Sequence, residues 1–243
     1  MGPVGMAGGG FGLIGLVLAL LFGGDVLGGD GSSNPFGAGA PDPNDDQAQF
    51  VGFVVDDVQD FWTAEFGRAG RQYQPTRLVL FSSATNTGCG FASSQTGPFY
   101  CPADEKVYID LTFFGELQRR FGAPGDFAQA YVVAHEFGHH VQHLLRLDET
   151  LGQGDNEASV RFELMADCLA GVWGRSAEAE GLLESGDLEE GLGAAAAVGD
   201  DRIQQQTQGR VTPENWTHGS AEQRTSAFRR GFDGGRLQTC VSG

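Results

Sequence analysis

The stretch that decides how this chain is organised is His135-Glu136-Phe137-Gly138-His139, inside a helical pattern near residues 126–147. Two histidines four residues apart on a helix stand one turn above one another, so both imidazoles can reach the same ion. Zinc suits this geometry because it accepts neutral imidazole nitrogens without demanding a stiff coordination shape. Glu136, about 100° around the helix from His135, could take a proton from a water molecule at that ion. The simpler alternative is a surface helix with two solvated histidines.

A catalytic zinc ion needs three protein ligands and an open fourth position, so a third ligand is expected. Glu163 is the best candidate, because it lies 24 residues after His139 in a helical segment long enough to pack antiparallel. Asp167 falls one turn later, where its carboxylate could accept a hydrogen bond from a ligand histidine. Apolar neighbours argue against the alternative of two solvent-facing acids. We expect His140 and His143 to be supporting or solvated residues and not ligands.

Patterns of strands and helices surround these two segments. Arg77–Phe81 and the alternating Val107–Phe113 indicate strands. Helical patterns run near residues 51–62, 126–147, 156–178, 187–207 and 220–231. Few strands followed by many helices predict an α+β domain with a small sheet, not a doubly wound α/β fold. No glycine-rich phosphate-binding loop follows a strand, which disfavours nucleotide-dependent chemistry.

The N-terminal region differs from the rest of the chain. Residues 1–24 carry no charged side chain and contain the 12-residue apolar run Phe11–Phe22. Because no basic residue precedes this run, we expect residues 1–24 to be an uncleaved membrane anchor, with a cleaved signal segment as the alternative. Residues 25–46 are rich in Gly, Asp, Ser, Pro and Asn and indicate a flexible acidic linker. The globular domain is therefore expected at residues 47–243.

The net charge of the chain limits its partners. Fifteen basic residues face 32 acidic ones in 243 residues, a net charge of -17 at pH 7. Such a field repels phosphate backbones, so we expect no nucleic-acid partner. Lys106 is the only lysine, and no basic cluster is present to bind anionic lipid head groups. Any contact with a membrane must therefore be made by the apolar segment.

Four cysteines are present, and none forms a C-x-x-C pair, which disfavours a cysteine zinc site. Cys89 and Cys101 bracket a 12-residue separation rich in Gly and Ser, a loop that a disulfide would rigidify. This leaves Cys168 to pair with Cys240. Two disulfides would place the domain in an oxidising space outside the cytoplasm. Buried reduced thiols are the alternative for either pair.

Two segments of the chain carry a resemblance to a known family, His135–Gln142 (HEFGHHVQ) and Glu163–Trp173 (ELMADCLAGVW). They closely resemble the bacterial neutral zinc metallopeptidase family, the YpfJ-like proteins. Further blocks extend the resemblance over roughly residues 47–240: Gly88–Gly90, Gly97–Asp104, Val107–Asp110, Gly199–Arg202, Thr217–Ser220 and Gln223–Arg224. The resemblance implies a membrane-anchored, zincin-like fold with one catalytic zinc ion bound by His135, His139 and Glu163. This chain departs from the family by lacking a charged, Arg-containing stretch before the apolar segment.

Two further features could serve a substrate. In zincins, an edge strand before the metal-binding helix pairs with an extended peptide substrate. The resemblance therefore implies that Tyr108, Ile109 and Asp110 are substrate-binding residues. An interior strand would show the same alternation. His218 could stabilise the oxyanion of a tetrahedral intermediate, and a capping or structural role is as good an interpretation. The segment Gly199–Arg202 could be a salt-linked helix feature or a cation site, and nothing in the sequence favours the second.

These expectations describe a membrane-tethered zinc metallopeptidase, with Glu136 as general base and peptides or proteins as substrates. It would be held in the bacterial inner membrane by a single span, with its catalytic domain outside the cytoplasm. One alternative is a non-catalytic extracytoplasmic binding or assembly protein that contains zinc. Another is a zinc hydrolase that acts on a different bond, because the same water activation serves several carbonyl substrates. A structural zinc would be closed by four protein ligands, whereas the motif supplies three and a base.

Overall fold

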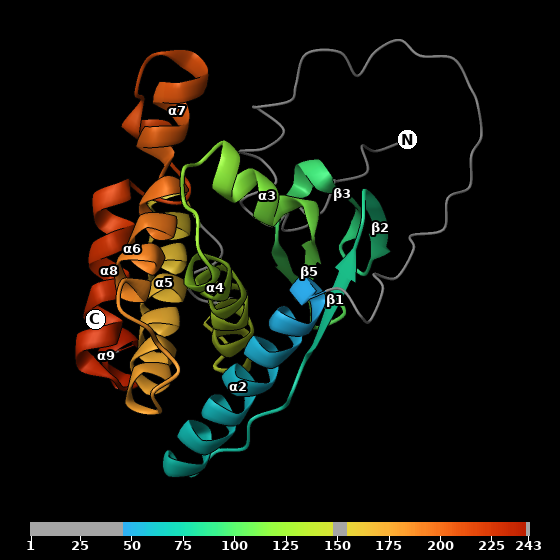
Figure 1. Ribbon diagram of the computed structural model, residues 1–243, viewed down its shortest axis with the longest axis vertical. Coiled ribbons are helices and arrows are strands. Elements are labelled where there is room, and N and C mark those ends of the chain that lie inside the picture. Colours follow the sequence, from blue (N-terminus) through green and yellow to red (C-terminus); the bar gives the residue numbers. More distant parts are fainter. Residues whose placement is uncertain (1–45, 148–154, 242–243) are drawn as a thin grey trace, which may run out of the picture.

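The computed structural model describes residues 46–147 and 155–241 (Figure 1). The elements, in chain order, are α2 (Asp46–Arg68), β1 (Arg77–Phe81), β2 (Ala84–Thr87), β3 (Gly90–Ser93), η1 (Ser94–Thr96), β4 (Phe99–Cys101), β5 (Lys106–Asp110), α3 (Thr112–Arg119), α4 (Asp126–Leu144), α5 (Asn156–Ala179), α6 (Asp187–Ala197), α7 (Asp200–Gln208), η2 (Pro213–Asn215), α8 (Ala221–Gly234) and α9 (Gln238–Val241). The predicted anchor, 1–24, lies outside these residues. Of the helices in the described ranges, none combines the length and the apolar character needed to cross a membrane.

Helix α4 is the centre of the molecule. Figure 1 shows the strands on one side of it and helices α5, α6 and α8 on the other. It packs directly against α5, α6 and α2, and its strand side contacts β4 and β5. Most residues of α4 are therefore buried, including large side chains such as Tyr131 and Phe137. The same buried environment surrounds the polar side chains of His135, Glu136, His140 and Gln142.

The strands form a small sheet and a separate hairpin. The sheet has the order β1-β5-β4, with β1 parallel and β4 antiparallel to β5. Strands β2 and β3 form a two-stranded antiparallel hairpin. The prediction of an α+β fold with a small sheet and many helices is confirmed.

Two predicted elements have different bounds in the structure. The strand predicted over Val107–Phe113 ends at Asp110, because the Asp110 carboxylate accepts hydrogen bonds from the N–H and hydroxyl of Thr112 at 2.9 and 2.8 Å. These bonds turn the chain into α3. The single helix predicted over 187–207 is also wrong, since α6 ends at Ala197 and α7 begins at Asp200. The helix is interrupted at Gly199, where a Cβ atom would lie 2.3 Å from the backbone nitrogen of Ala221.

Helices α5 and α8 approach one another until their backbones touch. A Cβ atom on Gly171 would lie 2.0 Å from the carbonyl oxygen of Phe228, and one on Gly231 would lie 1.8 Å from that of Cys168. Only glycine fits at such a crossing, because any side chain would overlap the opposite backbone. The two glycines thus fix α8 directly against the helix that carries Glu163.

Both predicted disulfides are present. The bond between Cys89 and Cys101 joins the turn of the β2–β3 hairpin to β4. The bond between Cys168 and Cys240 joins α5 to α9. The predicted pairing is therefore confirmed.

Candidate metal centre

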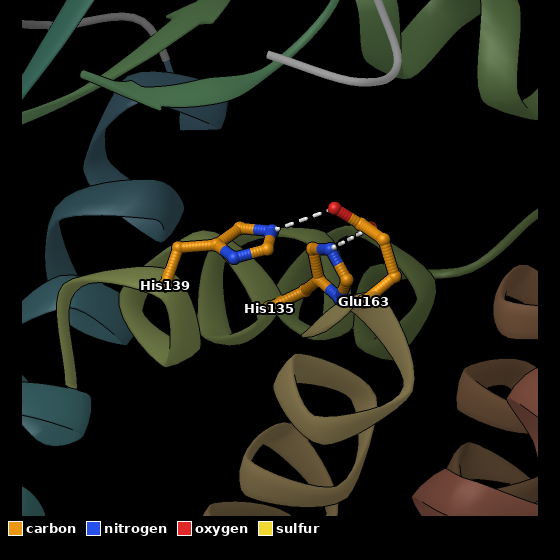
Figure 2. A group of neighbouring side chains, drawn as sticks. All are labelled: His135, His139 and Glu163. Carbon is orange, nitrogen blue, oxygen red and sulfur yellow. Dashed lines mark ion pairs between the residues drawn. The ribbon is translucent and has the colours of Figure 1, made fainter. Parts of the chain in front are cut away.

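His135, His139 and Glu163 meet at one point between α4 and α5 (Figure 2). Oε2 of Glu163 lies 3.2 Å from Nε2 of His135, and Oε1 lies 3.3 Å from Nε2 of His139. One ligand atom from each residue lies within 4.8 Å of the other two. His135 and Glu163 are buried, whereas His139 is partly exposed. The side of the cluster formed by His139 is therefore nearest to solvent.

The two helices come together at Gly138, inside the HEFGH motif. A Cβ atom at this position would lie 3.0 Å from the carbonyl oxygen of Ala166, so glycine allows α4 and α5 a close approach. Glu163 lies one turn before Ala166 on α5. Figure 2 shows its carboxylate reaching over α4 toward the two imidazoles.

The carboxylate of Glu163 is suited to a cation. Both of its oxygens are buried, and neither makes a hydrogen bond with any part of the chain that the structure describes. Burial alone raises the pKa of a carboxyl group, but His139 and His135 lower the pKa of Glu163 well below its usual value. A buried, ionised carboxylate needs a positive partner. Two imidazole nitrogens and a carboxylate are the ligand set of a catalytic zinc site, so these residues fit a metal ion.

Each ligand histidine is held from behind by its other ring nitrogen. Nδ1 of His135 lies 2.9 Å from Oδ1 of Asp167, and Nδ1 of His139 lies 2.8 Å from Oε1 of Gln142. Gln142 in turn donates to the carbonyl oxygen of Phe162 at 2.6 Å, which orients its amide oxygen toward the ring. These acceptors keep the proton on Nδ1, so each Nε2 can present a lone pair to a metal ion.

Asp167 accepts a hydrogen bond from a ligand histidine, as its spacing from Glu163 predicts, and two further side chains hold it there. Its carboxylate accepts hydrogen bonds from the hydroxyl of Tyr131 at 2.5 Å and from the guanidinium of Arg224 at 2.8 and 2.9 Å. Burial alone would raise the pKa of Asp167, but Arg224 and then His135 lower this pKa to about 2. The carboxylate is therefore ionised beside the ligand ring.

Glu136 lies between the two ligand histidines in the sequence and is buried. Burial raises the pKa of its carboxyl group, and His135 and His139 offset part of this increase. A carboxyl group with a raised pKa takes up a proton more readily than an ordinary carboxyl group does. Its role as general base stays a prediction.

His218 is buried just before α8, with one ring nitrogen engaged and one without a partner. Nδ1 lies 2.9 Å from Oδ1 of Asp200, whereas Nε2 is buried and makes no hydrogen bond within the described ranges. The next residue, Gly219, packs on α5, where a Cβ atom would lie 3.3 Å from Leu164. The loop that carries His218 therefore lies against α5, at Val160 and Leu164.

The side chain of Asp200 anchors this loop by accepting hydrogen bonds from the backbone of the loop. Its Oδ2 accepts hydrogen bonds from the N–H groups of Thr217, His218 and Gly219 at 2.8, 2.7 and 3.1 Å. The sequence allows the segment Gly199–Arg202 to be either a salt-linked helix feature or a cation site. The structure supports the salt-linked feature, with His218 as the partner of Asp200. The described residues give no support for a cation site there.

The strand before α4 is an interior strand and not an edge strand. Strand β5 lies between β1 and β4, which overturns the premise for substrate pairing at Tyr108, Ile109 and Asp110. All three side chains are buried. The Tyr108 hydroxyl donates to Asp104 at 2.6 Å, and the Asp110 carboxylate accepts from the N–H of Ser83 at 3.0 Å. These residues support the sheet and present no exposed side chain to a substrate.

The two extra histidines lie outside the metal-binding cluster. Nε2 of His140 donates to the carbonyl oxygen of Gln74 at 2.7 Å, and Nδ1 lies 3.1 Å from the hydroxyl of Tyr100. Burial lowers the pKa of His140, which favours the neutral ring. His143 is partly exposed and lies 3.8 Å from Glu105.

Three residues of this centre, Gln142, Tyr131 and Arg224, were given no role from the sequence, although Gln142 and Arg224 lie in segments that resemble the family. Gln142 lies three residues after His139, on the same helix face, and that spacing could have identified it. Tyr131 and Arg224 hold Asp167 from α4 and α8. Only the fold brings them together, because 57 residues separate Arg224 from Asp167.

Comparison with known proteins agrees with this centre. A family model described as "Putative neutral zinc metallopeptidase" matches residues 2–242. "Uncharacterized protein YpfJ" of Escherichia coli (strain K12) is 51% identical over 207 residues, covering 82% of this chain and 72% of that protein. "Uncharacterized protein Rv2575" of Mycobacterium tuberculosis is 50% identical over 182 residues, covering 69% of this chain and 62% of that protein. No solved structure matches. The chain therefore belongs to the family described as putative neutral zinc metallopeptidases.

Proposed function

We propose that this chain is a zinc-dependent peptidase that hydrolyses peptide bonds. The observation that carries the proposal is the Glu163 carboxylate. It is buried and faces Nε2 of both His135 and His139, and it has no hydrogen-bond partner within the described ranges. Family membership supports zinc as the ion.

In this proposal, His135, His139 and Glu163 hold the zinc ion. Bound zinc supplies a Lewis acid that polarises a carbonyl group and lowers the pKa of a water molecule. Asp167 and Gln142 keep the two imidazoles oriented, because each accepts the Nδ1 proton of one ring.

Glu136 supplies the proton transfers. Its carboxylate accepts a proton from the attacking water and later gives a proton to the leaving amine nitrogen. The raised pKa of Glu136 supports both steps, because a more basic carboxylate accepts the proton more readily and still releases it to an amine.

His218 stabilises the negative charge that develops on the carbonyl oxygen. A ring protonated on both nitrogens donates from Nδ1 to Asp200 and leaves the Nε2 proton for the oxyanion. The buried Nε2, without a hydrogen-bond partner among the described residues, on a loop that packs on the Glu163 helix at Leu164, supports this role. The hydrogen bonds of Asp200 to the loop support a fixed donor, which needs no reorganisation during the reaction.

One experiment separates this function from its alternatives. The full chain in detergent is assayed for bound zinc and for cleavage of an unbiased peptide library. We expect one zinc ion per chain and cleavage that Glu136→Gln abolishes without loss of zinc. The matched control is Glu157→Gln, the same change at an exposed position of α5 whose side chain is 81% accessible. It should leave both zinc content and cleavage unchanged.

The other outcomes have distinct meanings. Cleavage that persists in Glu136→Gln would contradict the general-base role. Zinc without any peptide cleavage would favour the non-catalytic binding protein, or a hydrolase of another bond, which ester and amide substrates would distinguish. Absence of zinc from the folded chain would contradict the metal site itself.

We also propose that the domain lies outside the cytoplasm, tethered to the inner membrane by residues 1–24. The two disulfides support an oxidising compartment. The uncharged, apolar start of the sequence supports the tether.

A further inference from the structure

Arg224 is a fully buried arginine directly behind the metal-binding cluster. Its Nε donates to Oδ2 of Asp167 at 2.8 Å, and its Nη2 donates to Oδ1 of the same carboxylate at 2.9 Å. Both side chains of this pair have an exposed fraction of 0%. Two parallel hydrogen bonds of this kind fix the plane of a carboxylate, which a single bond does not.

The plane of this carboxylate matters because Oδ1 is shared. Oδ1 of Asp167 accepts from Nη2 of Arg224, from the hydroxyl of Tyr131 and from Nδ1 of His135. Nη2 also donates to the Tyr131 hydroxyl at 3.2 Å and lies 3.4 Å from Nδ1 of His135 itself. Rotation of the carboxylate would therefore remove the acceptor that orients the imidazole.

Arg224 also joins three helices and the residue that follows α6. It belongs to α8 and contacts Asp167 on α5 and Tyr131 on α4, and its Nη1 donates to the carbonyl oxygen of Val198, after the end of α6, at 3.2 Å. The same α8 begins directly after the loop of His218. The guanidinium thus connects the helices that carry the metal ligands to the segment that carries the proposed oxyanion donor.

We propose that Arg224 is a positioning residue of the metal site, acting through Asp167 to hold His135 in the orientation that binds the ion. This inference rests on the proposed metal-binding function of His135, His139 and Glu163. The competing explanation is a buried ion pair that serves folding alone. Such a pair would leave metal affinity unchanged in any variant that still folds.

Zinc affinity of the full chain distinguishes the two explanations. The dissociation constant is measured by competition with a chromophoric chelator, after circular dichroism has verified the fold of each variant. Arg224→Met should raise the constant by about 10-fold or more, the usual effect of removing a group that orients a ligand histidine. Arg224→Lys keeps the charge but loses the paired hydrogen bonds, so it should also weaken zinc binding. It is the variant to use if Arg224→Met does not fold.

The matched control is Arg230→Met, which makes the same change at an exposed position of α8. It should change the dissociation constant by less than about 2-fold, as expected for a surface substitution away from the site. A double-mutant cycle then tests the route of action. In the Asp167→Asn background, Arg224→Met should add less than about 2-fold, because the group through which Arg224 acts has already been altered.

Each outcome supports or overturns a defined statement. Folded Arg224 variants that bind zinc as tightly as Arg230→Met would overturn this inference and leave the proposed function intact. Independent, multiplicative effects of the two substitutions would overturn the route through Asp167. Failure of the unaltered chain to bind zinc would overturn the proposed function, and this inference with it.

Discussion

One carboxylate, that of Asp200, fixes the loop on which the proposed oxyanion donor lies. Three consecutive backbone N–H groups and Nδ1 of His218 donate to it. Burial alone would raise the pKa of Asp200, but the bond from His218 and the backbone N–H groups lower it below its usual value. These donors stabilise the charged form, so the loop is held most firmly when Asp200 is ionised.

The lowered pKa predicts how stability depends on acid pH. The folded pKa lies below the unfolded value of about 3.9. The stabilisation by Asp200 is therefore complete above about pH 5 and is lost as pH falls through the folded pKa. Asp200→Asn should lower the free energy of unfolding by about 2 kcal/mol at neutral pH, and the difference from the unaltered chain should shrink below about pH 4.

Urea unfolding of the metal-free chain at a series of pH values measures this difference. The exposed Asp60→Asn on α2 is the control, and it should change the unfolding free energy by less than about 0.5 kcal/mol. A difference between the unaltered chain and Asp200→Asn that stays constant down to about pH 3 would contradict the linkage.

At the same scale, residues related by helix periodicity could be predicted from the sequence. His135 and His139 are one turn apart, and so are Glu163 and Asp167, so each pair was placed on one helix face before the fold was known. His218 and Arg224 owe their positions to contacts between distant segments. No local sequence pattern predicts that Arg224 is buried, because its partner Asp167 lies 57 residues away.

At the scale of elements, the contact between α5 and α8 sets the geometry of the site. Gly171 lies one turn after Asp167, and the backbone of α8 crosses α5 at that glycine. Gly171→Ala places a Cβ atom against the carbonyl oxygen of Phe228, and only movement of the helices can relieve the overlap. We expect this change to cost about 1–3 kcal/mol of stability, as overpacking does, and to weaken zinc binding by displacing Arg224 from Asp167.

Gly52→Ala is the matched control for this prediction, because a Cβ atom there meets nothing within 4 Å on α2. It should stabilise the chain by roughly 0.5–1 kcal/mol through the higher helix propensity of alanine. Thermal or urea unfolding and chelator competition measure both effects. If Gly171→Ala were as stable as Gly52→Ala, the contact between the helices would not be the constraint that we infer.

Elements differ in how far the sequence revealed them. Helices α4 and α5 were found close to their bounds because each has a long apolar face with a helical period. Strands β2, β3 and β4 were not found, since they have only 3 or 4 residues and depend on pairing partners elsewhere in the chain. The break between α6 and α7 was missed because its cause is a contact of Gly199 with Ala221, which no helical period records.

For the whole molecule, the two disulfides lie on opposite sides of α4. One is on the strand side and joins residues 12 apart, and the other is on the helix side and joins residues 72 apart. By the loss of chain entropy in the unfolded state, the short link stabilises by about 3 kcal/mol and the long link by about 4 kcal/mol. These contributions together are comparable to the total stability of many domains, so reduction of both bonds is expected to destabilise the chain strongly.

This dependence predicts the state of the thiols in cells. We expect all 4 cysteines to be oxidised in growing bacteria, as the proposed extracytoplasmic location requires. Cells are quenched with acid and treated with a polyethylene glycol maleimide, before or after reduction. The chain should gain labels only after reduction, and the Cys168→Ala/Cys240→Ala variant should gain half as many, because it retains only the shorter link. Labelling of the unaltered chain without reduction would place the domain in a reducing space and contradict the proposed location. The metal centre contains no cysteine, so this result would not bear on it, and zinc binding would test it separately.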